Sequence, residues 1–239
     1  MKRNNGFTMT ELLVVIAVIA LLAALLIPTL SQSRNTAYRV FCLNNLHRIQ
    51  LASSMYALDN SGFLPPHDPR SKWPSQLQSI LKDPRGLFCP MDLLDLNSSP
   101  ANFTAPFDSL QRSYIMNGFY DFFKINTTSS DFTQLTKGLL PGQINESEIA
   151  DPASTLIFGE KIDTNVFYLN VTLPNAGFLT VLDESRHGFK NGTVVATGAN
   201  YSMADGSVTF LKFATDTSPL NMWGVTDASR TDSLICRPR

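Results

Sequence analysis

The chain has 239 residues, of which 44% are hydrophobic and only 16% are charged, and its formal net charge is −1. This hydrophobic content supports a folded core and excludes a globally disordered chain. Without an excess of Lys and Arg, a dedicated nucleic-acid-binding protein is not expected. Three cysteines without a CxxC pair are too few for a scaffold built on disulfides, and they form neither a zinc ribbon nor a thioredoxin-like motif.

An uninterrupted apolar run occupies residues 12–27. Residues 8–30 predict a helix of about 34 Å, which is long enough to cross a hydrocarbon core of ~30 Å. Lys2 and Arg3 precede the run and no acid comes before Glu11, so the N-terminus is expected on the cytoplasmic side. A run of this kind fits a cleaved secretory signal peptide, a plain membrane anchor, or an anchor that also takes part in assembly.

Glu11 favours the third alternative. It lies at the N-terminal edge of the apolar run, where a carboxylate carried to the bilayer centre costs about 2.5–3.5 kcal/mol. A signal peptide gains nothing from such an acid. An acid in a membrane helix instead indicates a charge partner.

The segment Gly6-Phe7-Thr8-Met9-Thr10-Glu11-Leu12 resembles the processing motif of type IV prepilins and type II secretion pseudopilins. The resemblance implies that a prepilin peptidase and N-methyltransferase cuts after Gly6 and methylates Phe7. Because Gly6 has no side chain, the extended backbone can enter a protease cleft closely. Glu11 would then be the fifth residue of the mature chain.

The same resemblance implies a place and partners for the protein. It would be a single-pass protein of the bacterial inner membrane, with its C-terminal domain in the periplasm, that later enters a filament. Its partners would be an inner-membrane assembly platform and other pilin-like subunits, contacted through the N-terminal helix. Glu11 of one subunit would pair with the N-terminal amine at Phe7 of its neighbour, and the penalty for an unpaired buried charge would enforce the register.

The helix is expected to continue past Pro28, where many pilin helices bend. Residues 31–59 show amphipathic spacing at threes and fours, and the sequence from Asp59 to Gly62, followed by Pro65 and Pro66, predicts its end. The positions on the predicted apolar stripe are Ala37, Val40, Phe41, Leu46, Ile49, Ala52, Ser53, Tyr56 and Ala57. The predicted division is a leader at 1–6, a transmembrane and assembly helix at 7–30, its amphipathic continuation at 31–60, and an extracytoplasmic globular domain at 61–239.

The globular part is predicted to hold short elements followed by strands. Residues 60–153 indicate turns and short elements: a brief helix near 73–81, and short apolar strand or loop segments at 87–90 and 113–118. Strands are expected at 155–160, 166–171, 177–182, 193–197, 200–204 and 207–213. The predicted fold class is α+β and pilin-like: a long N-terminal helix packed on a mainly antiparallel C-terminal sheet with long loops.

Asp205-Gly206 lies between two alternating runs and predicts a hairpin with a type I′ turn, in which both residues have positive φ. Tyr201 and Met203 are expected on one face of this hairpin, with Val208 and Phe210 as their partners on the return strand.

Several fragments resemble a subgroup of pilin-like proteins with a downstream His and an Asp-Gly pair. They are the Cys-x-Asn-Asn-Leu pattern at 42–46, Phe88-Cys89-Pro90, Arg186-His187-Gly188, and the hairpin turn at Met203–Gly206. The interval between His187 and Asp205 is longer here than in that subgroup, because residues 190–199 form a lengthened loop. The resemblance therefore implies kinship and not a particular activity.

Cys42 and Cys89 are a candidate disulfide, because both would lie outside the cytoplasmic membrane, where disulfides persist. A bond would hold the Cys89 loop against the long helix and contribute roughly 3–4 kcal/mol by the chain-entropy model. Two separately buried thiols are the alternative. Cys236 could pair with either cysteine or stay free.

A metal site is a second candidate, formed by Asp183, Glu184, His187 and Asp205. Some pseudopilins hold calcium in a C-terminal loop, and carboxylates suit this hard cation, although His is a poor ligand for it. Otherwise His187 is expected to bond to the backbone of a turn, and Asp205 to be a turn residue. No cofactor other than this calcium ion is expected.

The chain has no GxSxG, HExxH or phosphate-loop motif, so no catalytic residues are predicted. The favoured function is a non-enzymatic structural subunit of a type II secretion pseudopilus or of a type IV pilus-like filament. The alternative is a membrane-anchored extracytoplasmic module that binds a secreted substrate, a glycan or DNA. A membrane-anchored enzyme is a third, less favoured class.

Overall fold

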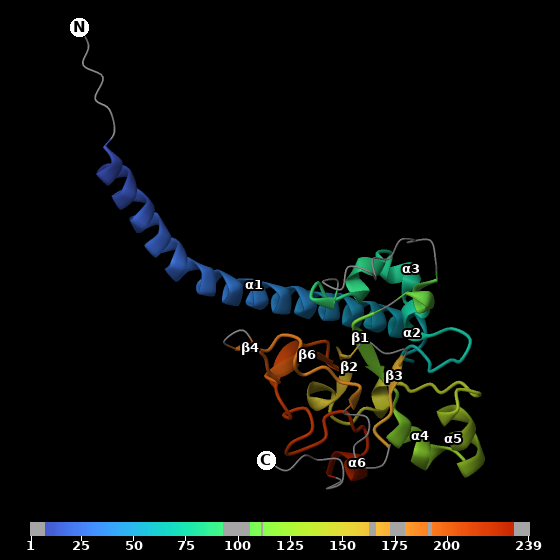
Figure 1. Ribbon diagram of the computed structural model, residues 1–239. Helices are drawn as coiled ribbons and strands as arrows, with labels where there is room; N and C mark the ends of the chain where they lie inside the picture. The colour runs from blue at the N-terminus through green and yellow to red at the C-terminus, as the bar shows by residue number, and fades with distance from the viewer. Residues whose placement is uncertain are drawn as a thin grey trace. The chain divides into compact units, whose positions relative to one another are not determined.

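The computed structural model describes residues 8–92, 106–110, 112–162, 166–172, 180–190 and 193–231 (Figure 1). The chain divides into two compact units, residues 1–37 and residues 38–239. Most of the first unit is helix, and the second unit holds the sheet and the remaining helices.

Helix α1 runs from Met9 to Asp59, a length of 51 residues, and continues through position 28 as predicted. By length and composition, its N-terminal part can cross a membrane, and none of that apolar stretch is buried inside the structure. The helix ends where the sequence predicted. Ser61 and Gly62 adopt positive φ, and the Gly62 amide donates back to the Ala57 carbonyl at 2.8 Å, which closes the helix end.

The part of α1 within the second unit buries one stripe of side chains. Cys42, Leu46, Ile49, Ala52 and Ala57 are all at most 2% exposed and belong to the main core. The predicted stripe was wrong at its beginning, because Val40 and Phe41 are more than half exposed. The buried stripe begins at Cys42, directly after Phe41, where strand β6 (Gly198–Met203) and the loop around Cys89 contact the helix.

A five-stranded sheet has the order β3-β1-β2-β6-β7. Its strands are β1 Tyr114–Asn117, β2 Leu156–Glu160, β3 Tyr168–Leu169, β6 Gly198–Met203 and β7 Val208–Lys212. Strand β3 pairs with β1 in parallel, and the other pairings are antiparallel, which confirms the predicted α+β, mainly antiparallel, pilin-like architecture. A separate hairpin, β4 Phe189–Lys190 with β5 Thr193–Val194, lies in the lengthened loop.

The sheet is covered on both faces. On β1, Tyr114 and Met116 join the core that contains the α1 stripe and Trp73, whereas Ile115 joins a second core with Trp223. Successive side chains of a strand point to opposite faces, so this alternation places one core on each side of the sheet. Double coverage explains why every residue of β1 is buried.

The short helices surround this framework. They are α2 Trp73–Gln76, α3 Gln78–Leu81, η1 Pro84–Leu87, η4 Phe107–Ser109, α4 Tyr120–Asn126, α5 Ser129–Thr136, η5 Glu146–Glu148, η6 Pro152–Ser154 and α6 Asp227–Thr231. The helix expected near 73–81 is present as the α2–α3 pair. Helices α4 and α5 lie where only loops were predicted. A local signal for α5 was available, because the Thr128 side chain caps it by accepting the Asp131 amide.

The hairpin at Asp205-Gly206 is present, but its turn differs from the prediction. Gly206 has φ +91°, Asp205 does not have a positive φ, and the Met203 carbonyl accepts the Gly206 amide at 3.1 Å. The loop is therefore longer than a two-residue type I′ turn, and the register changes with it. Tyr201 opposes Thr209, whereas Val208 opposes Ser202 and Phe210 opposes Asn200.

Other predicted strands are only partly tested. The run 166–171 contains β3, which covers two of its residues, and the run 193–197 contains β5 at its start. Residues 173–179, which include the beginning of the run 177–182, lie outside the described residues.

Candidate functional site

The start of α1 is built around Thr8 and Glu11. The Thr8 backbone N–H and hydroxyl both donate to Glu11 Oε2, at 2.8 and 2.7 Å, and the Glu11 amide donates to Thr8 Oγ1 at 3.2 Å. This reciprocal arrangement is a capping box, which satisfies backbone donors that a helix start otherwise leaves open. Glu11 therefore has a structural task within its own helix. Gly6 and Phe7 lie outside the described residues.

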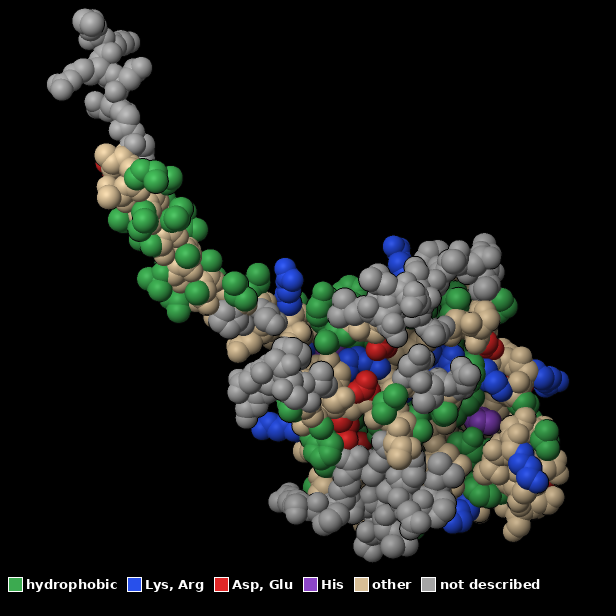
Figure 2. All heavy atoms as spheres, in the orientation of Figure 1, with side chains coloured by type: hydrophobic (Ala, Val, Ile, Leu, Met, Phe, Trp, Pro, Cys, Tyr) green, Lys and Arg blue, Asp and Glu red, His purple; other side chains and the backbone are tan. Residues whose placement is uncertain are grey.

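The apolar part of α1 exposes large hydrophobic side chains, and Figure 2 shows them along the face in view. They are Leu12, Leu13, Val14, Val15, Ile16, Val18, Ile19, Leu21, Leu22, Leu25, Leu26 and Ile27, each at least 45% exposed. A helix that is apolar all round belongs in a bilayer or among other helices, because water disfavours so large an apolar surface.

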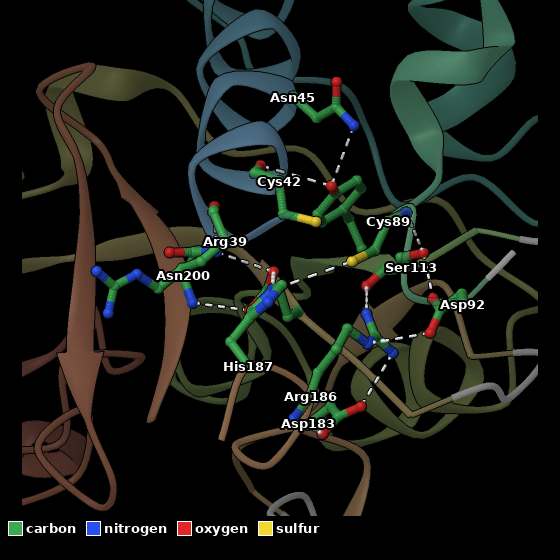
Figure 3. Close-up of polar contacts among 12 residues, drawn as sticks. Arg39, Cys42, Asn45, Cys89, Asp92, Ser113, Asp183, Arg186, His187 and Asn200 are labelled. Atoms are coloured by element: carbon green, nitrogen blue, oxygen red, sulfur yellow. Dashed lines mark hydrogen bonds and ion pairs between the residues drawn. The ribbon is translucent and has the colours of Figure 1, made fainter. Parts of the chain in front are cut away.

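A second site lies inside the globular unit (Figure 3). Cys42 on α1, Cys89 after η1, Glu160 at the end of β2 and His187 before β4 converge there, and we call these four residues the CCEH cluster. Their sulfur, nitrogen and carboxylate atoms lie within 4.8 Å of one another, and all four residues are buried. Four separate segments of the chain thus meet at one point.

The centre of the CCEH cluster is a pair between Glu160 and His187. Glu160 Oε1 lies 2.8 Å from His187 Nε2, and both side chains are fully buried. Cys89 Sγ lies 4.0 Å from the same nitrogen. Asn200 orients the carboxylate, since its backbone N–H donates to Oε2 at 2.9 Å and its Nδ2 donates to Oε1 at 3.1 Å.

The pKa values of Cys42, Cys89 and His187 are strongly shifted. Burial by itself raises the pKa of Cys89, but hydrogen bonds from Cys42 and His187 outweigh burial and lower that pKa to about 6. Burial alone would lower the pKa of His187, but its hydrogen bonds with Cys89 and Glu160 prevail and raise the pKa to about 9. The neighbouring Cys89 and burial raise the pKa of Cys42. These shifts move Cys89 toward its thiolate form and His187 toward its protonated form.

Arg186, next to His187, fixes this segment. Its guanidinium forms ion pairs of 3.0 Å with Asp92 and with Asp183, and its side chain is only 4% exposed. Asp92 also accepts the Ser113 hydroxyl, and Ser113 Oγ in turn accepts the Cys89 amide at 2.6 Å. A chain of polar contacts therefore links the loop of Cys89 to the loop of His187.

Among the described residues, the structure does not gather the four residues predicted for calcium into one group. Asp183 pairs with Arg186, Glu184 Oε1 accepts the Ala214 amide at 2.8 Å, and Asp205 is exposed in the β6–β7 turn, where it accepts from Ser207. Only His187 belongs to the converging set. The expectation that His187 bonds to the backbone of a turn was also wrong, because its partner is the Glu160 carboxylate.

Sequence reasoning missed Glu160 and Asn200. A signal for Glu160 was available, because it is a charged residue at the end of the strongly β-forming run 155–160. The structure buries it together with that strand. Asn200 gave no comparable signal, because its contact depends on the pairing of β2 with β6.

Cys42 and Cys89 come together in the cluster as free, buried thiols. The disulfide between them stays a prediction, and Cys236 lies outside the described residues.

The geometry of the cluster does not support nucleophilic catalysis. In a catalytic Cys–His arrangement, one ring nitrogen faces the nucleophile while the other is held by an orienting group. Here Cys89 and Glu160 both face Nε2, and His187 Nδ1 has no hydrogen-bond partner among the described residues. All four members of the cluster are also buried.

The long helix with Glu11 in its first turn, followed by a mainly antiparallel sheet, is a pilin-like architecture, and the N-terminal part of the helix is long and apolar enough to cross a membrane. Residues 1–27 match the family model of the prokaryotic N-terminal methylation motif. This match includes Gly6, Phe7 and Glu11.

Two bacterial relatives match about a quarter of the chain. Over 63 residues, the chain is 38% identical to type II secretion system core protein G of Klebsiella pneumoniae and 41% identical to the type IV wide pilus major component PilA4 of Thermus thermophilus. Each alignment covers 26% of this chain, and they cover 45% and 48% of those relatives. The chain thus spans less than half the length of these relatives. No solved structure matches the chain.

Proposed function

We propose that this protein is a non-enzymatic structural subunit of a type II secretion pseudopilus or of a type IV pilus-like filament. The observation that carries the proposal is the match of residues 1–27 to the methylation motif, with Glu11 fifth after the Gly6–Phe7 junction. The exposed apolar surface of α1 supports it, because this surface must be covered by lipid before assembly and by other helices afterwards.

The proposed sequence of events starts in the bacterial inner membrane. Lys2 and Arg3 hold the leader, residues 1–6, on the cytoplasmic side while the domain 61–239 is exported. A prepilin peptidase cuts after Gly6 and methylates Phe7. The assembly platform then transfers the helix, residues 7–30 with their continuation to residue 60, into a bundle of pilin-like subunits.

Glu11 sets the register of this bundle in the proposal. Among apolar helices, its carboxylate is strongly disfavoured unless it faces a positive charge. The N-terminal amine of Phe7 on a neighbouring subunit supplies that charge, whether methylated or not. A subunit shifted along the filament axis would leave both groups unpaired.

Intact mass and N-terminal sequencing of the protein from the membranes of its own host test the proposal. A chain that begins at N-methylated Phe7 is expected. A chain that begins at Met1 would identify a plain anchored protein, and one that begins after residue 27 would identify a discarded signal peptide.

A pair of variants locates the cut. In Gly6→Leu the leader should remain attached, because a side chain at this position keeps the backbone out of the protease cleft. Asn5→Leu adds the same side chain one residue earlier and should still be cleaved. Mature-length protein in the Gly6→Leu variant would contradict the assigned site.

A further inference from the structure

We propose that Cys42, Cys89, Glu160 and His187 form a closed binding site for a thiophilic divalent metal ion, of which zinc is the best fit. This structural metal site goes beyond the proposed filament role and does not depend on it. It rests on four different donor residues whose ligand atoms lie within 4.8 Å of one another in a fully buried position.

The spacing of the donors suits a tetrahedral ion. Zinc bonds of about 2.0–2.3 Å place neighbouring ligand atoms about 3.3–3.8 Å apart. The observed separations include 2.8 Å between Glu160 Oε1 and His187 Nε2 and 4.0 Å between His187 Nε2 and Cys89 Sγ, on either side of that range. Side-chain shifts of about 1 Å or less bring these donors onto a tetrahedron around one ion.

The donor types select the class of metal. Two sulfurs, one imidazole nitrogen and one carboxylate oxygen suit zinc and similar borderline or soft ions, whereas calcium and magnesium require mostly oxygen ligands. All four positions around the ion would come from the protein. Such a closed site has a structural role and leaves no coordination position for a substrate.

The surroundings hold the donors in place. Asn200 donates twice to the Glu160 carboxylate, and Ser113 Oγ accepts the Cys89 amide at 2.6 Å. Arg186, between Asp92 and Asp183, anchors the backbone next to His187. Outer contacts of this kind orient metal ligands and strengthen binding.

The metal would compensate buried charge. In the metal-bound form, two thiolates and one carboxylate carry three negative charges, and the imidazole is neutral. A divalent ion reduces the net charge of the site to minus one, beside the Arg186 guanidinium. Removing unpaired charges from water is strongly unfavourable, so a cation at the centre favours the closed arrangement. The bound metal would also connect helix α1, through Cys42, to strand β2 of the sheet, through Glu160.

The competing arrangement is the Cys42–Cys89 disulfide, which uses two of the four donors and leaves the Glu160–His187 ion pair beside it. Thiolates bound to zinc are not oxidised to a disulfide at the same time. Metal content and thiol state of the same sample therefore distinguish the two arrangements.

The experiment uses the full-length chain, purified in detergent from host membranes with metal-free buffers and rapid alkylation of free thiols. Elemental mass spectrometry should find one zinc ion per chain, and peptide mass spectrometry should find Cys42 and Cys89 unoxidised. Adding cobalt(II) to the chelator-treated protein should give thiolate-to-metal charge-transfer bands and the intense visible bands of tetrahedral cobalt. A Cys42–Cys89 disulfide in the native sample, or no zinc uptake by the reduced protein, would overturn the proposal.

Variants assign the ligands. Cys89→Ser and Glu160→Gln should each reduce zinc affinity by at least about tenfold, since each removes or weakens one donor. Asp205→Asn is the control, because it removes a carboxylate from the predicted calcium set but lies outside the cluster, and its zinc content should equal that of the wild type. If Cys89→Ser fails to fold, the cobalt spectrum of the wild type decides, and a spectrum without thiolate bands would reject the site.

Discussion

The Thr8 amide N–H lies 2.8 Å from Glu11 Oε2, and the Glu11 amide N–H lies 3.2 Å from Thr8 Oγ1. The carboxylate that we propose as the charge partner in the filament thus also closes the capping box of its own helix. The two roles differ in one respect: a capping box needs an oxygen acceptor, whereas pairing with an amine needs a negative charge.

Substitutions at this pair should separate the two roles. Glu11→Gln retains an acceptor for the capping box but removes the charge, and we expect membrane insertion without filament assembly. Thr8→Ala retains the charge and should cost about 0.5–2 kcal/mol of helix stability while leaving assembly in place. Sheared filament yield, measured beside the amount of membrane-inserted subunit, checks both. Normal filament yield in Glu11→Gln would rule out the charge pair.

Asp121 is expected to be a major stabilising residue of the globular unit. Its Oδ2 accepts the amides of Val225 at 2.7 Å and Thr226 at 3.0 Å, which joins α4 to the C-terminal segment before α6. Asp121→Ala leaves these donors without their acceptor and should lower the free energy of unfolding by about 2–4 kcal/mol. Asp121→Asn keeps one oxygen and should lose less. Denaturant unfolding of the detergent-purified protein measures both, and equal stability of the alanine variant and the wild type would refute the assignment.

His67 should make the fold sensitive to acid. Burial, and secondarily the charge of Lys72, lower the pKa of His67 to about 4, while Asp68 opposes this shift. Neutral Nε2 lies 2.8 Å from the Tyr120 hydroxyl. The unfolded chain takes up a proton near pH 6.5, before the folded chain does, so stability is present above that pH and falls as the pH decreases toward 4. The loss is at most about 3 kcal/mol.

His67→Gln tests this dependence, because glutamine can still bond to Tyr120 but does not titrate. Thermal midpoints at pH 7 and pH 5 should differ less in the variant than in the wild type. An identical pH dependence in both proteins would show that other groups cause the acid sensitivity.

Two glycines of the β6–β7 hairpin should respond differently to alanine. At Gly198, φ is +136° and a Cβ atom would lie 1.9 Å from the Leu211 carbonyl oxygen. At Gly206, φ is +91° but a Cβ atom would meet nothing within 4 Å. We expect Gly206→Ala to cost about 1 kcal/mol from backbone strain, and Gly198→Ala to cost about 3 kcal/mol or more because the strands must also separate. Denaturant midpoints of the two variants check the order, and a smaller loss in Gly198→Ala would contradict it.

The same hairpin shows how far local reasoning extends. Asp205-Gly206 indicated where the chain turns, because glycine readily adopts the positive φ that the turn needs. The pairing of Tyr201 with Thr209 did not follow from this dipeptide. One additional loop residue changes the register, and a shift of one residue exchanges the two faces of a strand.

The sequence by itself determined the N-terminal motif, the 51-residue helix and the place where that helix ends. These features depend on neighbouring residues, on helical periodicity and on local capping, so they can be predicted without knowing what packs against them. The sequence also suggested that Cys42 and Cys89 meet, but only the tertiary structure placed Glu160 and His187 beside them. His187 is 27 residues from Glu160 and 98 from Cys89 in the chain, and they meet because strand pairing and packing against α1 bring distant segments together. No local pattern encodes such contacts, because each side chain finds its partner only after the strand order and the buried face of the helix are set.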